Sequence, residues 1–144
     1  VDDYYIDIMT ANLVNPRIRN TFQVFILPNL YGDIITDEAA QLQGGVGTAG
    51  SSNTGDRYAM FEAIHGSAPR KMERGEGEYA NPSSIIRALE MLLRHIALTD
   101  KADKLKKAMD ICLETEKKVV MTGHADGADA KTFTDYVIET LKKI

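Results

Sequence analysis

Residues 29–45, NLYGDIITDEAAQLQGG, follow an apolar run and predict a helix from about Gly32 to Gln43. The two glycines at 44 and 45 are expected to end it. Asp33 and Asp37 lie four residues apart, so their Cβ atoms share one face at about 5–6 Å. Two interpretations stay open: acids near a helix start are stabilised by the macrodipole, whereas two converging carboxylates can bind a hard cation. The first explains Asp33 better than Asp37.

The composition is that of a globular protein. The 144 residues, with 44% hydrophobic and 26% charged, suffice for one ordinary core. A net charge of -4 without a basic stripe argues against nucleic-acid binding. No apolar run approaches the roughly 20 residues of a membrane span, and the single cysteine favours a reducing cytoplasm. Because the chain opens with Val1 and not Met, we expect a segment of a longer polypeptide.

The remaining sequence predicts alternating helices and strands. Runs rich in β-branched and aromatic residues predict three short strands, at 22–27, 58–64 and 117–121. Helical spacing of apolar residues predicts four further helices, one stopped by Asn15-Pro16 and others starting at Ser83, Thr99 and Lys131, with Ser83 as a cap. Residues 44–57 and 65–82 are expected to be loops, and a connection as long as the second is often functional.

GVGTAG, residues 45–50, has the G-x-G-x-x-G spacing of a dinucleotide-binding turn. That turn works only where a strand precedes it and a helix follows, so that the pyrophosphate meets a helix N-terminus. Here a predicted helix precedes it and the loop SSNTGD follows. The motif is therefore interpreted as a connector or hinge.

The histidines and the cysteine have structural explanations as well as functional ones. Cys112 lies on an apolar helix face and predicts a buried thiol. His95 at a helix end complements the dipole, and His124 is either solvated or near a cofactor. His65 opens HGSAP, residues 65–69, directly after a predicted strand. Such a turn suits a phosphate or ribose, although ordinary turns use the same residues.

Three segments together carry a family resemblance: NLYGDIITDEAAQLQGG (29–45), GDRYAMFEAIHGSAP (55–69) and YANPSSIIRALEMLLRHI (79–96). They resemble the β-decarboxylating dehydrogenases, which include isocitrate, 3-isopropylmalate and homoisocitrate dehydrogenases. The resemblance runs from about Tyr4 to the last helix. It implies the C-terminal part of a two-domain α/β fold that is not a Rossmann fold. Residues 1–43 would end the second, dimer-interface domain, and 44–144 would complete the first, dinucleotide-binding domain.

The resemblance also implies a metal site. The family's GD-I-x-[ST]-D element supplies two carboxylates to Mg²⁺ or Mn²⁺, and these map onto Asp33 and Asp37. A third acid, in a Y-x-D-x-M pattern, comes from the partner subunit and maps onto Asp7, which implies a homodimer. Asp33 is also the candidate for managing the substrate's hydroxyl proton, a catalytic role.

The family's dinucleotide site maps onto the HGSAP loop. The resemblance implies that the adenosine half is cradled by His65, Gly66, Ser67, Ala68 and Asn81, with Glu62 near the nicotinamide. NAD-dependent members resemble HGSAPD and NADP-dependent ones HGTAPKY, whereas this chain has Arg70 and Lys71 after the proline. Two cations favour a 2′-phosphate, but the Tyr and Arg that complete the NADP clamp have no match around 122–126. Both cofactors stay open, with a slight preference for NADP.

FEAIHG resembles the FEATHG of isocitrate dehydrogenases more than the YEPVHG of isopropylmalate enzymes. The resemblance therefore implies oxidative decarboxylation of a 2-hydroxy acid, isocitrate to 2-oxoglutarate, with 3-isopropylmalate and homoisocitrate as alternatives. The family's substrate-binding arginines, its catalytic Tyr and its Lys precede this segment, so we expect the chain alone to be inactive. A non-catalytic regulatory subunit is the alternative of another class. Such subunits typically lose metal acids, and all three remain here.

Overall fold

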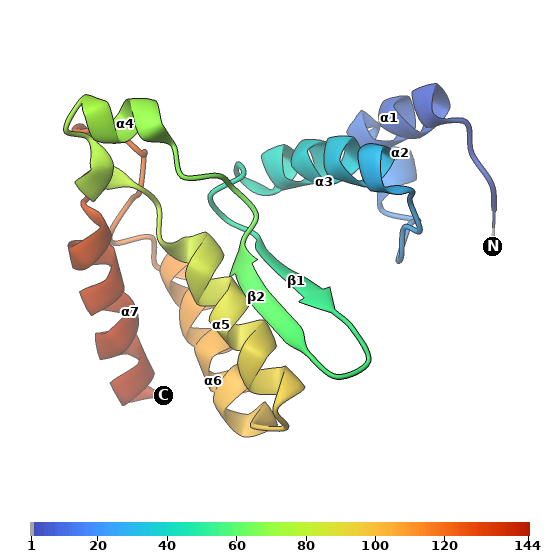
Figure 1. Cartoon of the computed structure of the whole chain (residues 1–144). Helices are drawn as coiled ribbons and strands as arrows, with labels where there is room; N and C mark the ends of the chain where they lie inside the picture. The colour runs from blue at the N-terminus through green and yellow to red at the C-terminus, as the bar shows by residue number, and fades with distance from the viewer. Residues whose placement is uncertain (1) are drawn as a thin grey trace. The chain divides into compact units, whose positions relative to one another are not determined.

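The computed structural model describes residues 2–144, which form an α/β structure (Figure 1). The chain divides into two compact units, Val1–Val46 and Gly47–Ile144. The division falls inside GVGTAG, slightly beyond the predicted boundary at 43/44. Assigning these units to the two domains of the family stays a prediction. None of the helices in the described part is long and apolar enough to cross a membrane.

The described residues of the first unit form three helices. They are α1 (Ile6–Val14), α2 (Pro16–Arg19) and α3 (Asn29–Gln43). The predicted stop at Asn15-Pro16 is confirmed: Asn15 ends α1, and its Oδ1 accepts a hydrogen bond from Arg17 N at 3.0 Å, which caps α2. A small core of Met9, Leu13 and Ile35 joins α1 to α3.

The predicted helix at 32–43 exists but begins earlier, at Asn29. Gly32 N already donates to Pro28 O at 2.7 Å, so Gly32 lies inside the first turn. The helix ends as predicted, at a glycine with positive φ: Gly44 has φ 139°, and its N–H bonds the carbonyl of Ala40.

The prediction of a strand at 22–27 is wrong. The segment is irregular, and the described residues of the first unit contain no strand. A strand's backbone groups need a paired neighbour, which local sequence does not supply. Val24 and Ile26 are 79% and 87% exposed, while the Phe22 ring contacts those of Tyr4 and Phe25 with centroids 5.6 and 5.3 Å away.

The second unit begins with a hairpin of β1 (Gly50–Thr54) and β2 (Ala59–Ala63), paired antiparallel from Gly50 opposite Ala63 to Thr54 opposite Ala59. The strand predicted at 58–64 is confirmed, and the prediction of loop throughout 44–57 is wrong. GSSNT has little β-propensity of its own, but the turn closed by Gly55 N to Tyr58 O, at 2.9 Å, lays it beside the apolar β2.

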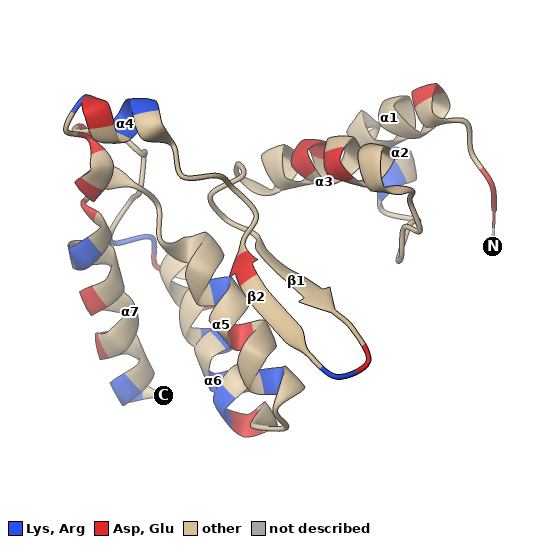
Figure 2. Ribbon diagram, viewed as in Figure 1, with Lys and Arg blue, Asp and Glu red and all other residues tan. Residues whose placement is uncertain are grey.

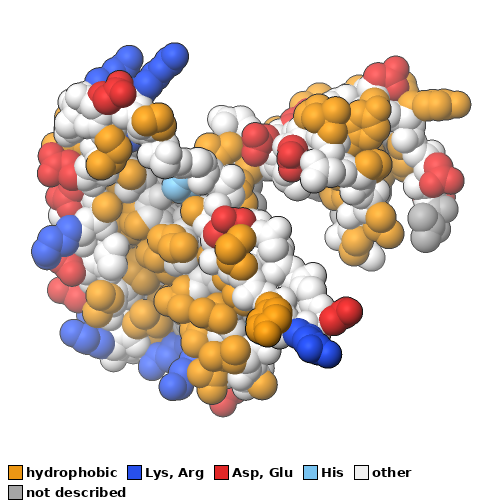
Figure 3. Space-filling model, viewed as in Figure 1, with side chains coloured by type: hydrophobic (Ala, Val, Ile, Leu, Met, Phe, Trp, Pro, Cys, Tyr) orange, Lys and Arg blue, Asp and Glu red, His pale blue; other side chains and the backbone are white. Residues whose placement is uncertain are grey.

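Helix α5 (Ser83–His95) packs against both strands. A Cβ on Gly50 would lie 2.5 Å from the backbone N of Ala88, so a glycine permits this close approach. Ser83 was predicted as the cap but is the first residue of the helix, and Pro82 is the N-cap. Ser83 N donates a hydrogen bond to Asn81 Oδ1, just before the helix, at 3.0 Å. In the space-filling view, apolar side chains gather over α5 and β2 (Figure 3). Met60 on β2 and Ile85 and Leu89 on α5 are exposed.

The main core lies between α6 (Thr99–Asp110), a π-helical turn (Ile111–Thr115) that continues it, and α7 (Ala130–Lys143). Both helices start close to their predicted positions. The buried side chains share these helices and the turn: Leu105, Ala108, Met109, Cys112, Phe133 and Val137.

Two irregular regions differ from prediction. Residues 65–82 contain a helix, α4 (Pro69–Glu73), and a 3₁₀ turn (Gly77–Tyr79), so this connection is partly ordered. Residues 117–121 are not a strand, since the described sheet has only β1 and β2 and offers 117–121 no paired neighbour. Val119 and Met121 instead pack as side chains on the core.

The start of α7 gives a pH-dependent prediction. Asp129 Oδ1 accepts from Thr132 N at 2.7 Å, and Oδ2 accepts from the Thr132 hydroxyl at 2.9 Å. These bonds hold the pKa of Asp129 below its usual value, the backbone N–H contributing most. Because its pKa is lower in the folded state, ionised Asp129 stabilises the fold at pH values above its unfolded pKa of about 3.9. This stabilisation is lost as the pH falls through the folded pKa.

Asp129→Ala should therefore lower the unfolding free energy at pH 6, and its deficit relative to wild type should shrink toward pH 3. Urea unfolding at both values measures this. Asp129→Asn is the control, because asparagine is an equally good cap without the charge. Its unfolding free energy at pH 6 should fall less than that of Asp129→Ala. A deficit for Asp129→Ala that stays constant with pH would contradict the assignment.

Candidate metal and nucleotide sites

Asp33 and Asp37 lie one turn apart on α3, and both are exposed. The ribbon coloured by charge shows acidic positions along α3 (Figure 2). Because α3 starts at Asn29, its first turn contains no acid. The stabilising effect of the macrodipole on acids falls off beyond that turn. The helix macrodipole therefore does not explain Asp33 or Asp37. The two like charges lie side by side on one helix face.

No hydrogen bond or ion pair involves either of these carboxylates within residues 2–144. The hydroxyl of Thr36, which lies between them in sequence, donates to the carbonyl oxygens of Gly32 and Asp33 at 2.7 and 3.3 Å. Like charges at this spacing cost stability unless a cation lies between them. The pair thus supplies oxygen ligands only, the kind that Mg²⁺ and Mn²⁺ prefer.

Asp7, the third predicted metal ligand, is in the first turn of α1 and exposed. Its Oδ1 accepts the backbone N–H of Ile8 at 2.8 Å. The described residues contain no cluster of three or more His, Cys, Asp or Glu able to hold a metal. One copy of the chain does not gather Asp7 with the α3 pair, and its service to a second subunit stays a prediction.

The HGSAP loop is fixed at its start by a buried serine. Ser84 Oγ accepts a hydrogen bond from Ile64 N at 3.1 Å and donates to the carbonyl of Ala49. This links the end of β2 and the start of β1 to the first turn of α5. His65 to Ala68 are exposed beyond this anchor, and His65 Nδ1 lies 3.0 Å from Gly66 O.

Ala68 adopts a left-handed backbone, with φ 47° and ψ 55°, immediately before α4. Such a conformation is uncommon for a residue other than glycine. The Ala68 carbonyl accepts hydrogen bonds from Lys71 N and Met72 N, at 2.9 and 3.3 Å. The turn thus sets the direction in which α4 leaves the loop.

Asn81 and Glu62, also predicted to meet the cofactor, are held by neighbours in the second unit. Asn81 Oδ1 accepts a hydrogen bond from Ser83 N at the start of α5, and the Asn81 Cβ would be 3.2 Å from a Cβ on Gly47. Glu62 lies exposed on β2, where its Oε1 accepts from Asn53 Nδ2 at 2.8 Å across the hairpin. Local bonds therefore orient the Asn81 and Glu62 side chains without a ligand.

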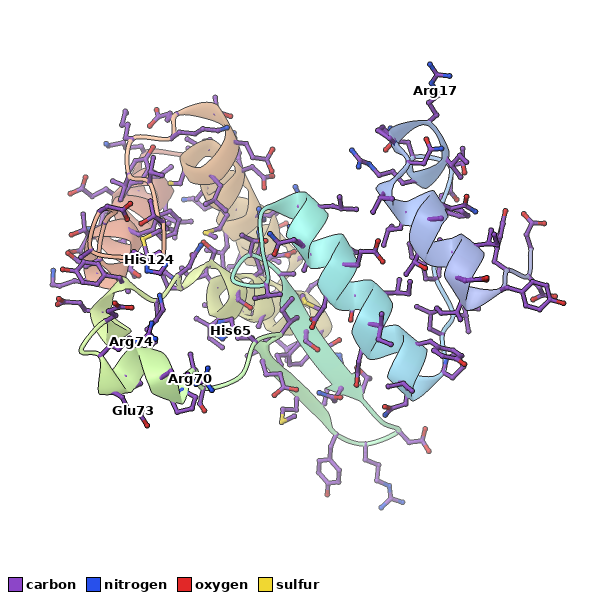
Figure 4. All side chains as sticks on the ribbon, turned by 90° about the horizontal axis from the view of Figure 1, so that it is seen from above. Arg17, His65, Arg70, Glu73, Arg74 and His124 are labelled. Carbon is purple, nitrogen blue, oxygen red and sulfur yellow. The ribbon has the colours of Figure 1, made fainter. Side chains whose placement is uncertain are left out.

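Arg70 and Lys71 have different surroundings. The Arg70 guanidinium is exposed, and no hydrogen bond or ion pair within residues 2–144 involves it. Lys71 Nζ instead donates to the carbonyl of Gly123. Viewed from above, the loop with His124 lies beside α4 and Arg74 (Figure 4). The contact between Lys71 and Gly123 was not predicted from the sequence. The glycines at 123 and 127, which allow a tight turn, were the only sign of it.

The remaining candidates are structural. Cys112 is 1% exposed and its Sγ donates to Thr140 Oγ1 at 3.4 Å, which confirms the buried thiol. His95 is in the last turn of α5, as predicted, and its ring centroid lies 5.3 Å from that of Phe61. His124 Nδ1 lies 3.9 Å from Glu76 Oε2 on the surface.

The sequence model of the isocitrate/isopropylmalate dehydrogenases matches residues 1–141. The chain belongs to the isocitrate/isopropylmalate dehydrogenase family. Relatives in this family include the "Isocitrate dehydrogenase [NADP]" of Rickettsia prowazekii, 39% identical over 99% of this chain and 29% of that protein. The "Isocitrate/homoisocitrate dehydrogenase" of Thermus thermophilus is 38% identical over the whole chain and 41% of its own length.

A solved structure agrees with this membership. The crystal structure of isocitrate dehydrogenase from Methylococcus capsulatus superposes with a TM-score of 0.87 at 30% identity, covering 98% of this chain and 40% of that one. The chain therefore spans between 29% and 41% of the length of these family members. The family resemblance predicted from the three sequence segments is confirmed.

Proposed function

We propose that this chain is the C-terminal part of a metal-dependent, NAD(P)-dependent β-decarboxylating dehydrogenase that converts isocitrate to 2-oxoglutarate. The observation that supports it most is the pair Asp33 and Asp37, exposed one turn apart on α3 and without a partner in the described residues. An exposed pair of like charges with no structural partner is what a cation site requires before its cation binds.

The donor set fits Mg²⁺ or Mn²⁺, and we assign the site to Asp33 and Asp37, with Asp7 contributed by the second subunit of a homodimer. A divalent cation there supplies Lewis acidity that stabilises the negative charge developing as CO₂ leaves. The two carboxylates of α3 would hold and orient the cation. We also assign to Asp33 the uptake of the proton of the substrate's hydroxyl group.

The nucleotide would lie along the HGSAP loop, with its adenosine half toward Asn81 and its nicotinamide toward Glu62. The exposed Arg70 guanidinium, with no partner of its own, is suited to a 2′-phosphate, which a planar cation binds well. This supports NADP over NAD, as does the name of the Rickettsia relative.

Homoisocitrate is the second candidate substrate, because the Thermus relative is named for both acids; 3-isopropylmalate follows. A regulatory subunit is disfavoured because all three metal acids are retained. The chain alone should be inactive. Its many exposed apolar side chains, such as Tyr5, Ile26 and Tyr58 at 85%, 87% and 85%, support burial against further polypeptide. The single cysteine supports our proposal of a cytoplasmic enzyme.

A chimaera tests this proposal. In it, this chain replaces the segment of the Thermus enzyme with which it aligns over 144 residues. We expect Mg²⁺-dependent reduction of NADP with isocitrate, and none from the 144-residue chain by itself. A folded, dimeric chimaera without activity toward isocitrate, homoisocitrate or 3-isopropylmalate would contradict the proposal, as would activity of the chain alone.

A further inference from the structure

Lys71 joins two segments that are 52 residues apart in the sequence. Its Nζ donates to the carbonyl of Gly123, and the side chain is half-buried. Gly123 has φ +81°, and a Cβ there would lie 3.4 Å from Lys71 Nζ. A glycine in this conformation turns its carbonyl toward α4 and leaves room for the ammonium group.

The segment that Lys71 reaches, residues 122–127, folds tightly on itself. Thr122 Oγ1 donates to Asp126 Oδ1 at 2.6 Å and accepts from His124 N at 3.2 Å. Gly127 N donates to His124 O at 3.0 Å, and a Cβ on Gly127 would be 2.4 Å from Thr122 Oγ1. This loop is thus compact in itself, and contacts from outside it can set its position against α4.

Two contacts link this loop to the segment at 71–76. One is the Lys71 bond, in which a half-buried charged donor meets a backbone carbonyl. The other is the approach of His124 Nδ1 to Glu76 Oε2, at 3.9 Å between a 68% exposed and a 33% exposed side chain. Long, exposed ion pairs contribute little, whereas hydrogen bonds from charged donors are among the stronger ones. Lys71 therefore carries most of the attachment.

Arg70 provides the comparison. It is the neighbouring residue on α4 and equally cationic, yet its guanidinium is exposed and has no partner in the described residues. Consecutive residues on a helix point about 100° apart, which is why only one of them reaches the loop. Arg70 and Lys71 therefore have different surroundings, although they are adjacent cations in the sequence.

We propose that Lys71 is a positioning residue that fastens the 122–127 loop to α4, and that it does not contact the nucleotide. This inference rests on the proposed function only in placing the nucleotide site beside α4. The attachment itself stands on the contacts within the second unit. Its consequence is that Lys71 affects binding of any adenine nucleotide, while discrimination of the 2′-phosphate does not depend on it.

Hydrogen exchange on the 144-residue chain tests the attachment directly. In Lys71→Met, the amides of Gly127 and Ala128 should exchange at least about tenfold faster, because a charge-assisted bond is lost. Lys71→Arg should restore most of the protection. Arg70→Met, the matched control on the same helix, should leave it unchanged. Unchanged exchange in Lys71→Met, or equal acceleration in Arg70→Met, would overturn the inference.

Titration with 2′,5′-ADP and 5′-AMP, followed by NMR, tests the second half. In Lys71→Met the affinities for both nucleotides should fall by the same factor, whereas Arg70→Met should weaken 2′,5′-ADP alone. Selective loss of 2′,5′-ADP binding in Lys71→Met would make Lys71 a phosphate ligand and overturn the inference. If the unmutated chain binds neither nucleotide at millimolar concentration, the proposed nucleotide site fails, and the exchange result still decides the attachment.

Discussion

Replacing Asp37 by Asn in the chimaera with the Thermus enzyme should lower isocitrate-dependent NADP reduction by about a hundredfold or more in saturating Mg²⁺. Asparagine keeps the size of the side chain and removes one of the two charges that Asp33 and Asp37 present on α3. A catalytic cation contributes several kcal/mol of charge stabilisation, and each 1.36 kcal/mol corresponds to a tenfold change in rate. Steady-state kinetics at several Mg²⁺ concentrations measures the effect.

Glu38→Gln is the matched control for Asp37→Asn. It removes the same charge from the next position of the same helix, on a face rotated by about 100°. It should leave kcat nearly unchanged. If Asp37→Asn kept full activity in saturating Mg²⁺, or if both variants lost activity equally, the acids of α3 would not act as a metal site.

Phe133→Ala should destabilise the second unit by about 3–5 kcal/mol, the cost of removing a fully buried aromatic side chain. Phe133 is 0% exposed and lies in the core that α6 and α7 share, with Met109 and Val137. This is a large part of the stability of a small unit. Urea unfolding followed by far-UV circular dichroism measures it, since α5, α6 and α7 carry much of the helical signal.

Phe25→Ala is the control for Phe133→Ala, because it makes the same substitution at a side chain that is 38% exposed. Phe25→Ala should lower the unfolding free energy far less, since less apolar surface leaves water at this position on folding. Equal losses for the two variants would mean that the core described around α6 and α7 is not the one that stabilises the chain.

The longer helices were predicted well from the sequence because their determinants are local, whereas the short α2 and α4 were not predicted. The predicted starts at Thr99 and Lys131 lie within one residue of the starts of α6 and α7. Strands were predicted poorly because their hydrogen bonds are not local. The apolar runs at 22–27 and 117–121 find no paired neighbour in the described residues, whereas the polar β1 is a strand because a turn places it beside β2.

The same distinction applies to the candidate sites. The shared face of Asp33 and Asp37 follows from their spacing, so it could be predicted. The start of α3 at Asn29 could not, and it is this start that removes the macrodipole explanation for both acids. Likewise, Arg70 and Lys71 look equivalent in sequence. Only the fold brings Gly123 to Lys71 and leaves Arg70 exposed.

The measurement that most directly tests the central claim is a Mn²⁺ titration of the dimeric chimaera, followed by electron paramagnetic resonance of the free ion. With the wild-type segment, one Mn²⁺ should bind per chain in the presence of isocitrate. With Asp33→Asn and Asp37→Asn combined, that binding should disappear while the dimer and the circular dichroism spectrum persist. Equal Mn²⁺ binding by the two chimaeras would contradict the assignment of α3 as the metal-binding helix.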